Sequence, residues 1–296
     1  MNHRLRSITC QVIGVLIRLY YDGPMNTNAA AATPIGGLLR TWRERRRLSQ
    51  LELAGAADIS ARHISFLETG RSVPSRGMLL RLAERLDIPL RERNALLLSA
   101  GYAPMYAERR LDDPALQQAR KAVELVIAGH EPYPALAVDR HWTLVSANAA
   151  VGPLLAGVDP KLLQPPVNVL RLGLHPEGLA PRIGNYAQWR EHTLTRLRQQ
   201  IAATADPILI ETLAELESYP RVTSAREEAQ SDAVDYGGVV VPFILRTENG
   251  LLSFFSTTTV FGTPLDITLA ELAIESFFPA DQKTAETLSR LGRPST

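Results

Sequence analysis

The stretch SQLELAGAADISARHISFLETGRSVPS, residues 49–75, decides the fold of the first part of the chain. Ser49 and Glu52 have the spacing of a capping box, in which each side chain bonds the backbone of the other residue where a helix begins. Ser60 can cap a second helix, ARHISFLE, and Gly70 is a favourable residue for ending it. This stretch therefore predicts two short helices joined by a tight turn.

The sequence on either side of this pair is also helical in character. Upstream, PIGGLLRTWRERRRL places its apolar residues at helical spacing. Downstream, Ser75 begins a leucine-rich helix that the Asp-Ile-Pro of residues 87–89 ends, and RERNALLLSAGY adds one more. Five short helices within residues 34–101 predict one compact all-α domain, in which Ile64 and Leu67 attach the second helix of the pair to the core.

Several positions in this domain match a known DNA-binding motif. The pattern resembles the phage-repressor-like helix-turn-helix of the XRE family of transcriptional regulators. The matching residues are Gln50, Glu52-Leu53-Ala54, Ile64, Leu67-Glu68 and Gly70-Arg71. The resemblance implies that the second helix of the pair enters the major groove of a double-stranded DNA operator.

The same resemblance implies which side chains contact DNA. Gln50 is expected at a helix N-terminus against a phosphate, and Arg71 is expected to hold the DNA backbone on the other side. Arg43 and Glu68 correspond to an ion pair between the first and third helices. The side chains expected to face the major groove are Ala61, Arg62, His63, Ser65 and Phe66.

Three of these positions have alternative interpretations. Arg62 is the best candidate for reading a base, because a guanidinium can bond guanine bidentately for about 1–3 kcal/mol of discrimination; the alternative is a plain surface arginine. His63 either contacts a phosphate or caps the helix. Phe66, where the family often has a polar residue, either contacts a thymine methyl or packs against a dimer partner.

Charge divides the chain into two unlike parts. Residues 34–110 carry 14 arginines and 8 acidic residues, a net charge of +6, whereas residues 111–296 sum to −7. A basic module joined to an acidic one indicates a half that binds a polyanion and a half with another task.

The acidic half mixes helical and strand patterns. Helices are predicted over 116–129, 185–204, 207–219 and 269–281, and a polar loop over 221–238. ALAVDRHWTLVSAN predicts two strands that meet at Asp139-Arg140. GGVVVPFILRTENGLLSFFSTTTVFG predicts two more that turn at Glu248-Asn249-Gly250, because Asn-Gly strongly favours a hairpin. The expected plan is α+β on an antiparallel sheet.

Three phrases in this half resemble known regulators. AVDRHWTLVSANAAV resembles the first hairpin of a PAS domain. STTTVFGTPLDITLAELAIESFFPAD and the junction RERNALLLSAGYAP are similar to the MmyB-like regulators, whose C-terminal portion is a PAS-like ligand-binding domain. The resemblance covers residues 105–282 and implies a sensor of a small apolar molecule, for example a fatty acid.

A PAS-type sheet with helices over one face encloses an apolar cavity that needs only a few polar anchors. The residues expected to line it are Trp142, Leu144, Asn148, Trp189, Phe243, Phe254 and Phe255. The candidate anchors for a carboxylate head are Asn168, Arg171, His175 and Arg190. The alternative is that the aromatic residues are plain core and that Arg171 is structural.

The motifs of most enzyme classes are missing from the sequence. There is no H-E-x-x-H, no P-loop, no G-x-G-x-x-G and no G-x-S-x-G. The single cysteine, Cys10, excludes an intrachain disulfide and a cysteine-based zinc cluster. We therefore expect no catalysis, no metal and no cofactor other than the bound effector. No segment is long and apolar enough to predict a membrane span.

The expected organisation is a multidomain chain: an all-α phage-repressor-like helix-turn-helix domain followed by an α+β PAS-like antiparallel-sheet domain. The boundaries are a poorly ordered leader (1–33), the DNA-binding domain (34–101), a connector (102–113), the ligand-binding domain (114–282) and a tail (283–296). The leader either belongs to the protein or lies upstream of a true start at Met25.

The sequence thus predicts a cytoplasmic, nucleoid-associated transcription regulator that senses a small apolar effector. A homodimer is expected because one helix-turn-helix reads only about half a turn of DNA. Its interface is expected on the helix at 94–100, where Leu96, Leu97 and Leu98 offer apolar surface; alternatively these leucines seat the acidic domain. The alternative function is a DNA-binding protein whose second half is only a dimerisation or protein-interaction platform with no ligand.

Overall fold

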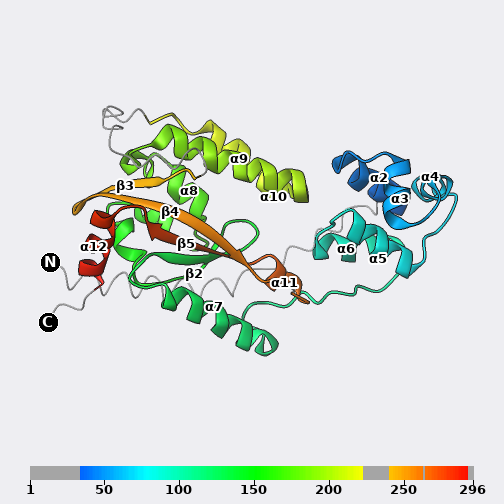
Figure 1. Cartoon of the computed structure of the whole chain (residues 1–296), viewed down its shortest axis with the longest axis horizontal. Helices are drawn as coiled ribbons and strands as arrows, with labels where there is room; N and C mark the ends of the chain where they lie inside the picture. Colours follow the sequence, from blue (N-terminus) through cyan, green and yellow to red (C-terminus); the bar gives the residue numbers. More distant parts are fainter. Residues whose placement is uncertain (1–33, 223–239, 263, 293–296) are drawn as a thin grey trace.

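The computed structural model in Figure 1 describes residues 34–222, 240–262 and 264–292. The leader expected over 1–33 and nearly all of the loop expected over 221–238 lie outside the described residues. The described chain has an all-helical part and a larger part built around one sheet (Figure 1).

The five helices predicted for the first part are all present. They are α2 (Ile35–Arg45), α3 (Gln50–Ala57), α4 (Ala61–Glu68), α5 (Arg76–Arg85) and α6 (Leu90–Ser99). Ser49 Oγ accepts from the backbone N–H of Glu52 at 3.1 Å, and the Glu52 carboxylate accepts from the backbone N–H of Ser49 at 2.7 Å. The capping box is therefore confirmed. Ser60 caps α4 through the backbone N–H of His63.

Helix α2 lies against the end of α4 at a position that requires glycine. A Cβ on Gly36 would lie 2.5 Å from the carbonyl oxygen of Leu67 and 2.6 Å from that of Glu68. Backbone atoms cannot yield as the end of a flexible side chain can, so any larger residue would push the two helices apart. Gly36 therefore sets the position of α4 relative to α2.

The leucines of α6 do not form the apolar surface that the sequence suggests. Leu96 and Leu97 are each 1% exposed and belong to the core of the helical domain, together with Ile64 and Leu67. Of the three leucines, Leu98 alone is exposed, at 59%. The prediction of a dimer interface made of all three leucines is therefore wrong, because the five helices bury Leu96 and Leu97 in their own core.

The second part begins with η1 (Pro114–Leu116) and α7 (Gln117–Gly129) and continues through a mixture of strands and helices. Its strands are β1 (Ala135–Val138), β2 (Leu144–Ala147), β3 (Phe243–Thr247), β4 (Gly250–Val260) and β5 (Ala273–Pro279). Its other helical elements are η2 (Gly152–Leu155), η3 (Pro160–Leu163), α8 (Val169–Leu174), η4 (Ala180–Arg182), α9 (Tyr186–Thr204), α10 (Pro207–Ser218), α11 (Ile267–Ala270) and α12 (Gln282–Leu291).

The strands form one antiparallel sheet in the order β2-β1-β5-β4-β3. Both predicted hairpins are present, since β1 pairs with β2 and β3 pairs with β4 around Gly250. The expected fold class, an all-α helix-turn-helix domain followed by an α+β antiparallel-sheet domain, is confirmed.

One predicted element is wrong. The segment 269–281, expected as a closing helix, is mainly β5, which lies between β1 and β4 at the centre of the sheet. A central strand is covered on both faces, and Ile274, Glu275 and Ser276 are consecutive buried residues, so the alternation typical of a strand is missing. Residues from 283 onward, expected as a tail, begin inside α12, which Asp281 caps.

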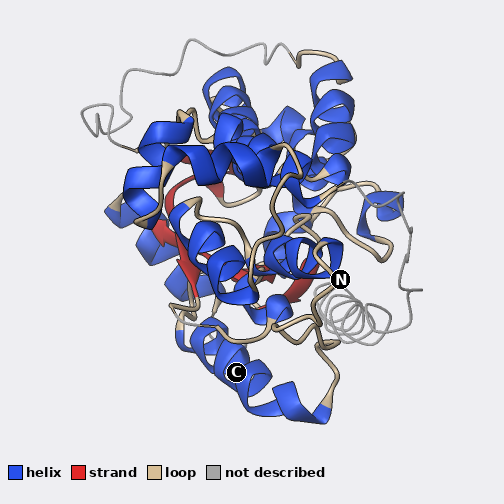
Figure 2. Cartoon of the chain, turned by 90° about the vertical axis from the view of Figure 1, so that its right-hand side faces the viewer, coloured by secondary structure: helices blue, strands red, loops and turns tan. Residues whose placement is uncertain are grey.

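Helices cover both faces of the sheet (Figures 1 and 2). On one face, α8, α9 and α10 pack their leucines on Phe243, Leu245 and Phe254 of β3 and β4. On the other face, α7 contributes Val123 and Ile127 to a smaller core over β1 and β5. The larger of these two cores is where the candidate ligand residues converge.

Candidate DNA-binding surface, ligand core and domain joint

Some of the predicted DNA-contacting residues are exposed on α4, whereas others pack against the rest of the helical domain. Arg62 is exposed, and Ser65 and Phe66 are half-buried. Ala61 packs against the helical core. His63 is half-buried, with Nε2 3.2 Å from the sulfur of Met78 on α5. Contacts of these residues with DNA stay a prediction, and the geometry favours Arg62 as the side chain with freest reach.

A buried ion pair fixes α4 to α2, as expected. Arg43 donates through Nε and NH2 to the two carboxylate oxygens of Glu68, at 2.7 and 3.0 Å, and through NH1 to the carbonyl of Leu48 at 2.7 Å. The Glu68 side chain is 4% exposed. Burial alone would raise the pKa of this carboxyl, but the bonds from Arg43 and Gln50 outweigh it and lower the pKa.

Gln50 is part of the same cluster. Its Nε2 donates to Glu68 at 2.8 Å, so one amide hydrogen is already used inside the domain. A phosphate contact by Gln50 stays a prediction, and it would use the remaining hydrogen.

Two arginines at the end of α2 serve the fold. The guanidinium carbons of Arg45 and Arg46 lie 4.5 and 5.4 Å from the centre of the Trp42 ring. Arg46 also donates to the carbonyls of Leu86 and Asp87, at 2.8 and 2.7 Å, where α5 ends. The sequence shows only three consecutive arginines at 45–47, and it reveals neither the ring contact nor the bonds to the end of α5.

In the second part, Trp142 lies in the β1–β2 turn with an unusual backbone. Its φ is +65°, in the left-handed region that is a genuine outlier for a bulky residue. Two residues of α9 hold its ring: Nε1 donates to Gln200 Oε1 at 2.8 Å, and the Arg196 guanidinium lies 5.1 Å from the ring centre. This tether brings the turn and α9 together over the larger core.

An aromatic cluster lies under α9. Trp189 is 4.8 Å from Phe243 between ring centres, and Phe243 is 6.2 Å from Phe254, which is fully buried. Phe277 of β5 completes the cluster, 6.0 Å from Phe243. The structure thus brings three predicted lining residues together. The sequence missed Phe277, because β5 was expected as a helix.

Asn148 and Asn168 already use their polar atoms within the fold. Asn148 donates to the carbonyls of Ile127 and Tyr133, and its Oδ1 accepts from the backbone N–H of Ala135. Asn168 caps α8 and donates from Nδ2 to the carbonyl of His141 at 2.8 Å. Each therefore has a structural role, Asn148 beside the smaller core and Asn168 beside the larger one.

The candidate anchors between α8, α9 and α10 differ in whether their polar atoms already have partners within the protein. Arg171 makes a two-pronged ion pair with Glu215, and the His175 ring packs edge-on against Tyr219 at 5.0 Å. Arg190 donates from NH2 to the carbonyls of Leu216 and Glu217. Its Nε is buried with no hydrogen-bond partner in the described part of the chain. Arg190 is therefore the anchor with an unused donor.

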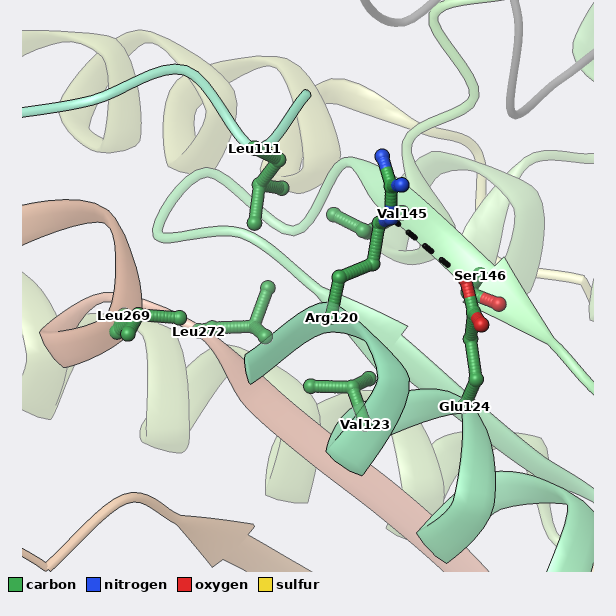
Figure 3. Close-up of a pocket in the computed structure, with 8 residues that line it drawn as sticks. All are labelled: Leu111, Arg120, Val123, Glu124, Val145, Ser146, Leu269 and Leu272. Atoms are coloured by element: carbon green, nitrogen blue, oxygen red, sulfur yellow. Dashed lines mark ion pairs between the residues drawn. The ribbon is translucent and has the colours of Figure 1, made fainter. Parts of the chain in front are cut away.

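A small cavity lies on the opposite face of the sheet, beneath the connector (Figure 3). It has room for little more than a single water molecule. The ion pair of Arg120 with Glu124, 3.9 Å apart on α7, lies at its polar side. The remaining lining residues are Leu111, Val123, Val145, Ser146, Leu269 and Leu272. Its size does not suit an effector.

The two parts of the chain meet where α6 lies beside α11. Arg91 donates to both carboxylate oxygens of Glu271, at 2.8 and 2.9 Å, and pairs with Glu108 of the connector at 2.6 Å. Arg140, in the β1–β2 turn, lies 3.7 Å from the same Glu271 and 3.5 Å from Asp206. We call these five residues the domain joint.

The connector is also held in place. Asn94 Oδ1 accepts from the backbone N–H groups of residues 105 and 106, at 2.9 and 3.1 Å, and its Nδ2 donates to the carbonyl of Tyr106 at 2.7 Å. Ala107 then pairs with Asp266 in a parallel bridge next to α11. The helical part and the sheet part are thus linked by an ordered segment.

No helix in the described part of the chain combines the length and apolar character needed to span a membrane. Likewise, over the described residues no three histidine, cysteine or acidic side chains gather where they could hold a metal ion.

A helix-turn-helix module joined to a ligand-binding domain defines a DNA-binding transcription regulator. Sequence comparison agrees on both halves. A helix-turn-helix domain family matches residues 34–96, and the family described as MmyB-like transcription regulator ligand binding domain matches residues 119–291. The second match spans more than half of the chain, so the protein belongs to the MmyB-like transcription regulators. Both matched families are regulatory domains and not enzymes.

Other comparisons add little. No curated protein matches the chain. A solved structure of an RNA-binding light-oxygen-voltage receptor is 15% identical, with a TM-score of 0.25, over 98% of this chain and 70% of that one.

Proposed function

We propose that this regulator binds a small apolar effector, with a fatty acid as the favoured class, and that the effector controls operator binding by a homodimer. The observation that carries the proposal is the domain joint, which connects the helix-turn-helix domain to the turn that holds Trp142. Because such a regulator would bind chromosomal DNA, we expect it in the cytoplasm, associated with the nucleoid.

The proposed ligand site lies between the sheet and α9. Trp142, Trp189, Phe243 and Phe254 would form its apolar wall, with Phe277 added from β5. These aromatic rings fill much of the core in the structure, so a ligand would enter by displacing the half-buried ones, Trp142 and Trp189.

Arg190 is the favoured anchor for a carboxylate head. Its unpartnered Nε is the feature that supports this choice, because a buried donor without an acceptor is costly and an incoming carboxylate would satisfy it. Arg171 and His175 rank below it, since neither has a buried polar atom without a hydrogen-bond partner among the described residues. Asn148 and Asn168 would act by fixing the strand and turn that border the site.

The β1–β2 turn supplies a physical route from this site to the DNA-binding domain. Gln200 bonds both the Trp142 indole and the carbonyl of Arg140, while the Arg140 guanidinium faces Glu271 of the joint. A ligand that moves Trp142 would therefore shift the Arg140 guanidinium beside Glu271, the ion-pair partner of Arg91. A 100-fold change in operator affinity needs about 2.7 kcal/mol of differential binding. Burying about four methylenes better in one state would supply that amount.

The test is thermal melting of the full chain with fatty acids of increasing length and with the matching alcohols. We expect acids to raise Tm more than alcohols, with a gain that grows with chain length. Trp189→Ala should reduce the shift for both series, whereas Arg190→Gln should reduce it for the acids alone. Arg198→Gln, an exposed arginine on the same helix, is the matched control.

Each outcome of this experiment separates the two candidate functions. If no acid or alcohol shifts the Tm of the wild-type chain, the effector proposal fails and the interaction platform takes its place. Sedimentation of the chain with operator DNA tests the homodimer, and a single copy per operator would contradict it.

A further inference from the structure

Phe66 occupies an unusual position on α4, the proposed recognition helix, which is expected to enter the major groove. The helical core comprises the buried apolar residues of α2 to α6, and Phe66 is not among them or the residues packed on them. Its side chain is half-buried on the outward side of α4. The Phe66 ring neither packs in the helical core nor carries a charge, so neither core packing nor charge explains its place on α4.

Two guanidinium groups lie over this one ring. The guanidinium carbon of Arg62 is 5.2 Å from the ring centre, and that of Arg71 is 6.0 Å away. Both distances fall within the reach of a cation–π interaction. Arg62 precedes Phe66 by four residues, so the two side chains lie one turn apart on the same face of the helix.

The second arginine reaches the ring because of how α4 ends. Gly70 has a φ of +71°, which turns the chain back, and the backbone N–H groups of Arg71 and Ser72 donate to the carbonyl of Phe66 at 2.8 and 3.2 Å. Phe66 therefore fixes Arg71 twice, through its carbonyl and through its ring.

Both guanidinium groups keep their charge available. Arg62 and Arg71 are exposed, and in the described part of the chain neither lies within ion-pair distance of a carboxylate. A ring restricts the direction of a guanidinium without using its N–H donors, because it interacts through the face of the cation. The two groups thus stay free to bond an anion while their orientation is limited.

We propose that Phe66 is a positioning residue that orients Arg62 and Arg71 before DNA arrives. The inference rests on the proposed role of α4 as the recognition helix and assigns Phe66 an indirect part in it. Preorientation reduces the freedom that the two long side chains lose on binding. Phe66 acts on base preference through Arg62 and on overall affinity through Arg71. This role requires no contact of Phe66 with a thymine methyl or with a dimer partner.

The test compares single and double variants on DNA selected by the wild-type protein from a randomised pool. Phe66→Leu should weaken preference at the base pair read by Arg62 by about twofold to fivefold, the size expected for losing an exposed cation–π contact. Phe66→Tyr keeps the ring and should retain the wild-type preference. Phe66→Met is a second ring-free variant in case the leucine variant folds poorly, and all variants should melt close to wild type.

The double variant decides between an indirect and a direct role. If Phe66 acts through Arg62, Phe66→Leu in an Arg62→Ala background should cause no further loss of preference at that base pair. Additive losses, a changed preference at a different base pair, or unchanged preference in both ring-free variants would each overturn the inference. Failure of the wild-type protein to select any DNA would instead contradict the proposed function.

Discussion

The arginines beside α4 differ from several arginines of the ligand-binding domain in whether a carboxylate pairs with them. In the helical domain, Arg62 and Arg71 around α4 and Arg76 on α5 have no ion pair within the described residues. In the ligand-binding domain, Arg171 pairs with Glu215, and Arg196 pairs with the buried Glu275. An unpaired guanidinium attracts phosphate, whereas a paired one is neutralised locally. Whether the arginines have carboxylate partners, more than how many arginines there are, therefore decides which half of the chain can bind a polyanion.

The largest expected effect is the salt dependence of DNA binding, because arginines without a carboxylate partner neutralise phosphates and release counterions. Raising salt from 50 to 200 mM should weaken binding to a DNA duplex by on the order of 10³-fold if six or more phosphates are contacted. Fluorescence anisotropy at several salt concentrations measures this, and Arg71→Gln should reduce the slope by about one. Arg171→Gln, at a paired arginine, should leave the slope unchanged. A flat salt profile would contradict the comparison.

The next effect contrasts a buried ion pair in the helical domain with an exposed one in the ligand-binding domain. Arg43→Met leaves Glu68 buried without its main partner, so the helical domain should lose about 3–5 kcal/mol of stability. Arg171→Met removes the partner of an exposed carboxylate and should cost about 1 kcal/mol or less. Hydrogen exchange at the amides of α4 and α8 reports each domain separately. Equal losses of stability in the two domains would contradict the expected difference between the buried and the exposed ion pair.

The smallest effect is the part of the pH dependence of the helical domain that comes from Glu68. The pKa of Glu68 is lowered in the folded state, so its contribution to stability is complete above the ordinary glutamate pKa and is lost as pH falls through the folded value. Between about pH 5 and 3, α4 amides should therefore lose protection in the wild type. Glu68→Gln should show a smaller change over the same range. An identical pH profile in both proteins would argue against this origin.

The helical domain was largely predictable because its signals are local. The capping box of Ser49 and Glu52 and the cap at Ser60 are each contained in four residues, and a sequence shows them directly. The Arg43–Glu68 pair could be predicted only by family resemblance, since 25 positions separate its members. The close approach of Gly36 to α4 and the two arginines over Phe66 depend on side-by-side packing, which local patterns do not reveal.

The ligand-binding domain was harder because its sheet joins distant segments. Its two hairpins were predicted from short turns, but β5 pairs with β1 across more than a hundred residues. Its buried centre removes the alternation that marks a strand, so the segment was predicted as a helix and Phe277 was missed. Among the candidate site residues, burial of Phe254 fits its aromatic character, whereas the backbone bonds of Asn148 have no signal in the sequence.

The three hydrogen bonds of Asn94 bear on where the chain can be divided for experiments. A fragment ended at residue 101 would contain all five helices but would strip Asn94 of its acceptor and both donors from residues 105 and 106. Extending the fragment through Arg109 keeps them and also keeps Glu108 opposite Arg91, although Glu271 would still be lost. Residues 102–109 are therefore better treated as the last segment of the DNA-binding half than as a spacer that can be replaced at will.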